Sequence, residues 1–346
     1  MKLSVGYFMP DEYNCISEII EDNLPSIDEI YFSFAEEPGG RSAAAPLSDK
    51  NYEEKKALQL EELEYISNDL GIKCALLFNA NCYGGDAISK ALEKRVVDKI
   101  SFLKSRLNID SVTTTSPFIA KVIKREFKDT IKVRASVNMR VGTVKAMEYL
   151  TDFDGFYMQR EFNRDFDRIK MLKEWCDKNG KTLHLLANSG CLKDCSFQTF
   201  HDNTVAHEQE IIKNDNVPLK YPSPCWDFME SLDHIERATK ILQNTWIRPE
   251  DLVHYEPYFE NVKIATRIHS NPAIVINAYA NGRVFGNVLD ITEPSYSHLF
   301  GNYILDNREI PADFFEKTSK CDKQCYKCSY CRSVAEKALV DISKYI

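Results

Sequence analysis

The sequence has no long apolar run. No stretch of it approaches the roughly 18 consecutive apolar residues that a membrane-spanning helix requires. The opening segment, MKLSVGYFMPDEYN, has an apolar part too short for the core of a signal peptide, and acidic residues follow it directly. We therefore expect a cytoplasmic protein with no membrane partner.

The sequence also lacks an excess of basic residues. Its 44 Lys and Arg are outnumbered by 52 Asp and Glu, for a formal charge of -8. This balance argues against a generally basic surface for nucleic acid, although a local basic groove is compatible with it. Charge alone thus neither indicates nor excludes RNA as a partner.

Two common hydrolase signatures, HExxH and GxSxG, are absent. A peptidase needs either a nucleophile with a base or a metal-bound water. The thiol and imidazole available for such a pair are those of Cys191 and His201. A peptidase therefore stays an alternative rather than the first expectation.

Cysteine, by contrast, is abundant, with 11 in the chain. The cytosol keeps ordinary thiols reduced, so we expect metal ligands rather than disulfides. Four cysteines are scattered and are predicted to be buried, inert thiols: Cys15, Cys74, Cys82 and Cys176. The other seven form two groups, one of Cys191, Cys195 and Cys225, and one of Cys321, Cys325, Cys328 and Cys331.

Short β-type apolar runs alternate with helical stretches whose apolar residues recur every three or four positions. The predicted strands are 2–9, 28–35, 72–79, 111–116, 131–137, 153–158, 182–188 and, as the best candidate for an eighth, 261–268. This order predicts an α/β fold, a TIM-like (β/α)8 barrel over 1–299, with a doubly wound open sheet as the alternative. The rest, 300–346, is predicted to be an irregular Cys-rich C-terminal extension that ends in a short helix. The loop 38–54 is predicted to be a mobile lid or disordered insert.

In such a barrel, the chemistry collects at the C-terminal ends of the strands. Polar side chains at or near these ends are the predicted substrate-binding residues: Arg134, Asn138, Arg140, Asn188 and Arg267. Because the guanidinium fork of arginine matches carboxylate or phosphate, they predict an anionic substrate.

The C-terminal motif CDKQCYKCSYC places four thiols within one short segment. Zinc sites usually divide their ligands into two separated pairs, whereas this compact run is typical of an iron-sulfur cluster. We therefore predict an iron-sulfur site here, with zinc as the alternative. Cys321, Cys325 and Cys328 also match the CxxxCxxC spacing of radical SAM enzymes, but their place near the end of the chain argues against that class.

The other group of thiols follows the seventh predicted strand. Cys191 and Cys195 lie in NSGCLKDCSFQTFHDN, and Cys225 lies in YPSPCWDF. Three thiolates can hold a cluster and leave one iron open to substrate. A fourth ligand could come from the C-terminal group, from Cys82 or Cys176, or from substrate or solvent.

The segment NSGCLKDCSFQTFHDN, the strand end MQREFN and the barrel rhythm resemble the peptidase U32 family over roughly residues 1–290. The resemblance implies a TIM-like barrel with a [4Fe-4S] cluster on cysteines, and an oxygen-independent hydroxylation of RNA or ubiquinone precursors. Arg160 and Glu161 match the family's Arg-Glu pair, and Cys191 and Cys195 match cysteines of its central motif. On this basis Arg160 and Glu161 are predicted catalytic residues, and His201, the imidazole available to Cys191, is the third.

The chain also departs from the family pattern. The approach to the first cysteine, LHLLANSG, lacks the usual glutamate and His-Gly pair, and the tail CDKQCYKCSYC is not a standard part of the RNA-modifying members. We therefore expect a divergent member with one or two [4Fe-4S] clusters and an electron donor protein as a further partner. Its substrate would be a small anion or RNA, and a zinc-stabilised binding protein is the remaining alternative.

Overall fold

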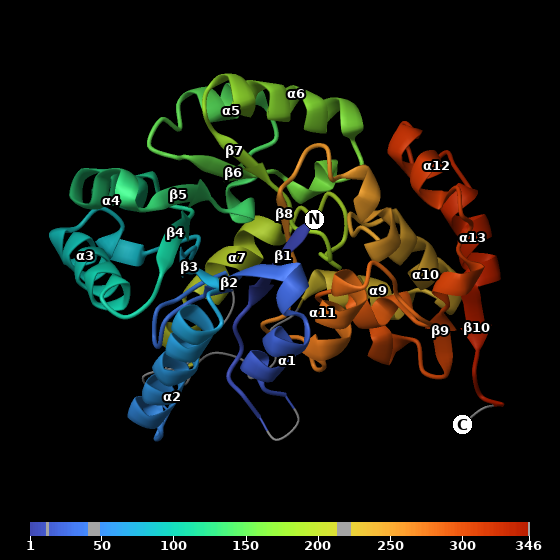
Figure 1. The fold of residues 1–346 in the computed structure, drawn as a ribbon. Coiled ribbons are helices and arrows are strands. Elements are labelled where there is room, and N and C mark those ends of the chain that lie inside the picture. The colour runs from blue at the N-terminus through green and yellow to red at the C-terminus, as the bar shows by residue number, and fades with distance from the viewer. Residues whose placement is uncertain (12–13, 41–48, 213–222, 345–346) are drawn as a thin grey trace.

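The computed structural model describes residues 1–11, 14–40, 49–212 and 223–344. Within them, eight parallel strands form a nearly closed barrel with helices around it (Figure 1). The strands are β1 (Lys2–Gly6), β2 (Ile27–Phe32), β3 (Lys73–Phe78), β4 (Ile109–Thr114), β5 (Lys132–Ala135), β6 (Gly155–Tyr157), β7 (Thr182–His184) and β8 (Asn261–Lys263). Their order in the sheet is β7-β6-β5-β4-β3-β2-β1-β8. The predicted TIM-like barrel is confirmed, and its strands overlap the predicted ranges but are mostly shorter.

The barrel closes between β7 and β8 through an irregular contact. Leu186, beyond the end of β7, forms a single parallel bridge with Lys263. The Ala187 amide donates to the Lys263 carbonyl at 2.9 Å, and the Lys263 amide donates to the Leu185 carbonyl at 3.1 Å. The segment after β7 therefore continues along β8 and delivers residues 188–195 to the C-terminal end of the barrel.

Helices between the strands cover the outside of the barrel (Figure 1). They are α1 (Ile16–Asp22), α2 (Tyr52–Glu64), α3 (Lys90–Lys104), α4 (Pro117–Phe127), α5 (Val144–Glu148) and α6 (Phe166–Lys178). Their ends follow local chemistry: the Ser116 hydroxyl accepts the Ile119 amide at 3.2 Å at the start of α4. After α6, Gly180 has a φ of 63°, as expected for a helix-terminating glycine.

A longer excursion separates β7 from β8. It contains α7 (Gln198–Ala206), α8 (Glu208–Ile212), α9 (Pro224–Ser231) and α10 (His234–Gln243), and α11 (Pro272–Ala280) follows β8. Cys191 and Cys195 precede α7, and Cys225 lies in the first turn of α9. This excursion is therefore what carries the first group of thiols.

The C-terminal segment is more regular than expected. It contains α12 (Phe314–Lys320), α13 (Tyr330–Ala338), β9 (Tyr303–Leu305) and β10 (Leu339–Asp341), and the two strands pair antiparallel. The predicted terminal helix ends at Ala338 because the next three residues pair with β9. In Figure 1, α12, α13 and β10 form one edge of the molecule, and α13 packs on α10.

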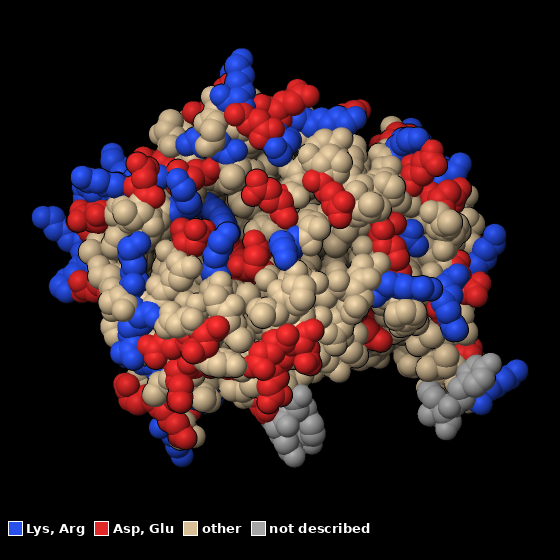
Figure 2. Space-filling model, in the orientation of Figure 1, with Lys and Arg blue, Asp and Glu red and all other residues tan. Residues whose placement is uncertain are grey.

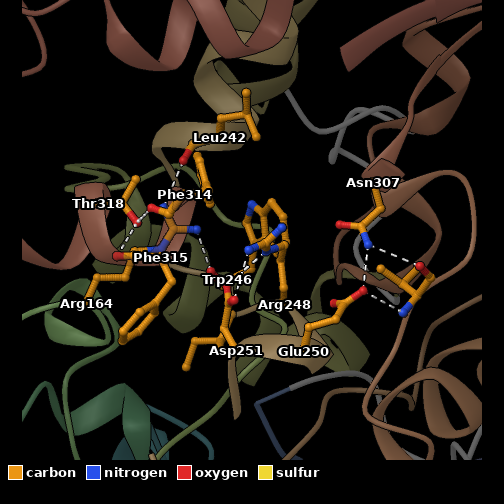
Figure 3. A network of polar contacts seen from close by, with 12 residues as sticks. Arg164, Leu242, Trp246, Arg248, Glu250, Asp251, Asn307, Phe314, Phe315 and Thr318 are labelled. Carbon is orange, nitrogen blue, oxygen red and sulfur yellow. Dashed lines mark hydrogen bonds and ion pairs between the residues drawn. The ribbon is translucent and has the colours of Figure 1, made fainter. Parts of the chain in front are cut away.

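Figure 3 shows how this segment is attached. The Arg164 guanidinium donates to the carbonyls of Leu242 at 2.9 Å and Trp246 at 2.6 Å, and it lies 5.3 Å from the ring centroid of Phe314. Arg248, which forms a two-pronged ion pair with Asp251 at 2.9 Å, lies 5.5 Å from the same ring. Two arginines thus clamp α12 to the barrel through one aromatic side chain.

The interior of the barrel contains a buried ion pair. Arg134 from β5 donates to Glu29 from β2, and the Ser4 hydroxyl donates to the other Glu29 oxygen at 2.6 Å. Because a buried charge is costly without a partner, this pair is a structural part of the barrel. On the outer face shown in Figure 2, by contrast, Lys and Arg are interspersed with Asp and Glu and form no continuous basic surface.

The predicted lid is placed only in part. Residues 41–48 of the loop 38–54 lie outside the described residues. Gly40, just before them, donates its amide to the Asn79 side chain at 3.0 Å. No described helix is long and apolar enough to span a membrane.

Candidate functional site

A cavity of about 330 Å³ opens at the C-terminal end of the barrel strands. Its walls come from the ends of β2, β3 and β8, the segments after β5, β6 and β7, and helices α7 and α9. Of the predicted site residues, the cavity is lined by Asn138, Arg160, Cys191, Cys195, His201, Cys225 and Arg267. The structure therefore brings one group of thiols and much of the predicted catalytic and substrate-binding set to one place.

The three thiols of this group all line the cavity and lie near one another. Cys191 and Cys195 reach it from the segment after β7, and Cys225 from α9. Burial raises the pKa of the Cys225 thiol, and the neighbouring Cys191 and Cys195 add to that rise. Collecting three thiolates is therefore unfavourable without a cation, and a bound cationic iron centre would offset their repulsion. The donor set fits an iron-sulfur cluster in this respect.

Asn188 and Gly190, which precede Cys191 in the same loop, explain how the thiol is positioned. Asn188 is fully buried, and its side chain donates to the carbonyls of Ala265 at 2.8 Å and Ile291 at 3.1 Å. Gly190 lies so close to the chain that a Cβ atom there would be 2.1 Å from the carbonyl oxygen of Pro294. Asn188 is thus a tether of the loop and Gly190 its close-packed turn. Neither residue lines the cavity.

The cavity is lined by two arginines, Arg160 and Arg267, and by two carboxylates, Asp202 and Glu293. Arg160 is 8% exposed and donates to the Ser189 hydroxyl at 3.3 Å. Arg267 donates to the Ser33 hydroxyl at 3.3 Å and reaches the same space from beyond β8. Two guanidinium groups on a partly apolar cavity suit a small anion with a carboxylate or phosphate.

Sequence reasoning missed Lys263, which also lines the cavity and is 9% exposed. Its Nζ lies 3.5 Å from the ring centroid of Tyr31 and 5.1 Å from that of Tyr157. Burial, followed by the nearby Arg267 charge, lowers the pKa of this amine to about 7. The sequence could have identified Lys263 by its position in the eighth predicted strand, NVKIATRI, because a lysine in the last strand of a barrel can face the interior. Glu293 and Tyr296 also line the cavity and were missed.

Three predicted substrate-binding residues do not line the cavity. Arg134 lies inside the barrel in its ion pair with Glu29, and Asn188 holds the loop. Arg140 donates to the side chain of Gln198 at 2.7 Å, and Gln198 does line the cavity. These three side chains contact neighbouring parts of the protein instead of the cavity. The position of a residue at a strand end does not reveal in which direction its side chain points.

Of the predicted catalytic residues, Arg160 and His201 line the cavity, and the His201 ring stacks on Phe197 at 5.8 Å. Glu161 instead lines a narrow cleft on the other side, together with Cys321, Cys325 and Cys331. Adjacent side chains of the Arg-Glu pair therefore face two different groups of thiols.

The C-terminal thiols form that second group. Cys331 is half-buried, and burial raises its pKa to about 11; Arg164 opposes this rise, while Cys325, Cys321 and Cys328 add to it. The other two alternatives for a fourth ligand, Cys82 and Cys176, do not line the cavity. Among the described residues, no group of three or more His, Cys, Asp or Glu side chains is arranged to hold a single metal ion.

Comparisons with known proteins place this geometry in context. No family model matches the chain. An uncharacterized protease of Methanocaldococcus jannaschii is 27% identical over 340 residues, which cover 95% of this chain and 94% of the relative. The solved structure of a U32 peptidase aligns with a TM-score of 0.52 at 15% identity, over 76% of this chain and 92% of that one. The chain therefore has the fold of a U32 peptidase, and a relative named as a protease matches it over nearly its whole length.

The match to the fold of a U32 peptidase agrees with the resemblance seen in the sequence. The structural match covers less of this chain than of the U32 peptidase. The curated relative, by contrast, aligns over nearly the whole chain. The predicted substrate chemistry and cofactors lie beyond what either match shows.

Proposed function

We propose that the cavity is the active site of a U32-type enzyme in which Cys191, Cys195 and Cys225 hold a [4Fe-4S] cluster. The observation that carries the proposal is that three thiols from two separate segments line one cavity, together with two arginines, at the C-terminal end of the barrel strands. When bound, such a cluster supplies electron transfer and, where an iron has no protein thiolate, a position open to substrate.

The proposed reaction is an oxygen-independent hydroxylation, or a related redox modification, of a small anionic substrate. Arg160 and Arg267 would bind and orient the anionic group. Lys263, whose amine has a pKa near 7, can accept or donate a proton at Nζ near neutral pH. A cavity of about 330 Å³ suits a small molecule, so an RNA substrate would have to insert a single nucleotide into it.

The C-terminal thiols support a second cluster. Cys321, Cys325 and Cys331 line a cleft with Glu161, while Arg160 faces the cavity. The two groups of thiols thus lie on either side of the Arg160–Phe162 turn, and we propose that the second cluster carries electrons between the first and a partner protein. The partner would accept two electrons in a hydroxylation by water and would donate them in a reductive modification.

Anaerobic purification tests the proposal. The expected product is a brown protein with several irons and sulfides per chain, and Cys225→Ser should lose the iron of the cavity site. Cys176→Ser is the matched control, because Cys176 is fully buried on α6 away from the cavity. A colourless protein that binds stoichiometric zinc would instead favour a zinc-stabilised protein.

A peptidase is the second candidate. It is favoured by the name of the curated relative, and Cys191 and His201 both line the cavity. Hydrolysis of unstructured peptides by the iron-free protein, lost in Cys191→Ser, would support it over the redox proposal.

A further inference from the structure

A third cysteine environment lies outside both groups of thiols. Cys82, in the loop after β3, was expected to be buried and inert, but it is partly exposed. Its sulfur accepts the backbone amide of Gly84 at 3.4 Å, and the His207 imidazole lies beside the same glycine, because a Cβ atom added at Gly84 would be 3.6 Å from Cε1 of that ring. The structure therefore pairs Cys82 with a histidine that is distant in sequence.

His207 is itself oriented by a carboxylate. Its Nδ1 lies 2.8 Å from Oε2 of Glu210, on the next helix, α8. A thiol, an imidazole and a carboxylate thus follow one another in space. This order is that of nucleophilic cysteine sites, in which the carboxylate orients the ring and the ring takes the thiol proton.

The electrostatics agree with this order. The His207 hydrogen bond, followed by the Gly84 amide, lowers the pKa of the Cys82 thiol. The Cys82 hydrogen bond, followed by that to Glu210, raises the pKa of His207. A lowered pKa for the thiol and a raised pKa for the imidazole are the shifts expected of a thiolate-imidazolium pair.

A substrate can approach this sulfur. Cys82 is partly exposed, and a Cβ atom added at the nearby Gly85 would meet no atom within 4 Å. The residue before Cys82, Asn81, donates to Asp202 at 3.3 Å, and Asp202 lines the barrel cavity. The pair therefore lies beside the cavity but does not share its wall.

We propose that Cys82, His207 and Glu210 form a second nucleophilic site, which takes activated acyl groups. The Cys82 sulfur attacks the acyl carbon, a carbon-sulfur bond forms, and the alcohol or phenol leaves with the proton held by His207. Water then hydrolyses the thioester and regenerates the thiol, so no oxidant or reductant is needed. The site is independent of the redox function proposed for the cavity.

The test is acylation of the full-length protein by a limiting amount of p-nitrophenyl acetate near pH 6.5, followed by peptide mass mapping. Cys15 is the matched control, because it is also partly exposed but its sulfur faces the Glu62 carboxylate at 3.5 Å rather than an imidazole. Cys82 should be acetylated about tenfold faster than Cys15. Equal rates at the two residues would overturn the proposal.

Two variants separate the roles. His207→Gln should lower the rate at Cys82 to about that of Cys15, and Glu210→Gln should lower it by about two- to threefold, because the exposed carboxylate only orients the ring. An unchanged rate in His207→Gln would contradict the assignment. If that variant does not fold, the proposal is tested instead by the pH dependence of iodoacetamide alkylation in the unmodified protein. Half-maximal alkylation of Cys82 must then lie at lower pH than that of Cys15, and coincident profiles refute the site.

Discussion

Replacing Lys263 by Met should make the folded protein less sensitive to pH between 7 and 10. The amine has a pKa of about 7 in the fold against 10.5 in an unfolded chain. Between these values the unfolded chain binds more protons than the folded one, so the stability of the unmodified protein rises with pH. Below pH 7 the penalty for charging the buried amine is fully present, at roughly 4 to 5 kcal/mol.

The expected size follows from these two values. Integration from pH 7 to pH 10 gives a gain of about 3.5 kcal/mol for the unmodified protein. The rings of Tyr31 and Tyr157 favour the charged amine and reduce this to roughly 2 kcal/mol. Methionine keeps much of the side-chain length and has no charge, so Lys263→Met should lack the gain.

Urea unfolding of the iron-free protein at pH 7, 8, 9 and 10 measures the effect. The difference in unfolding free energy between Lys263→Met and the unmodified protein should shrink by about 2 kcal/mol across this range, since all other titrating groups cancel. Lys240→Met on α10 is the control, because Lys240 is neither buried nor part of the cavity. Parallel pH profiles for Lys263→Met and the unmodified protein would refute the reasoning.

Three further outcomes are expected. Cys328→Ser should remove about half of the iron and leave the spectrum of the cavity cluster intact if the tail holds its own cluster; loss of that spectrum would mean one shared cluster. Asn188→Ala should lower the free energy of unfolding by about 3 kcal/mol in urea titrations, because the buried Ala265 and Ile291 carbonyls lose their donor; a loss below about 1 kcal/mol would contradict the tether. Gly190→Ala should destabilise the loop and impair iron binding at the cavity site, because the new methyl group meets the Pro294 carbonyl, and full iron content measured by colorimetric assay would contradict this.

Several features could be predicted from local pattern. The alternation of short apolar runs with amphipathic stretches identifies a parallel barrel, because each strand and helix must bury one face against its neighbours. The rule that parallel strands end at one edge was enough to place Cys191, Arg160 and Asn138 near a common opening. The helix end at Gly180 also follows from local chemistry alone.

Other features depend on contacts between distant segments. Arg134 and Lys263 are both basic residues on barrel strands, yet the first is paired with Glu29 inside the barrel and the second opens onto the cavity. Whether a basic side chain forms an internal ion pair or faces the cavity depends on the strand register and on the residues opposite it. The sequence around the residue shows neither of these. The pairing of Cys82 with His207 has the same origin.

The sequence by itself determined the class of fold and the presence of two groups of thiols, because apolar periodicity and cysteine spacing are properties of neighbouring residues. Only the tertiary structure decided which side chains face the cavity, which hold its walls, and which lie in the second cleft. The physical reason is that burial and the charges across a cavity set a side chain's chemistry, and both come from residues far away in the chain. Lys263 is the clearest case, since its pKa near 7 comes from burial and from Arg267 rather than from any local motif.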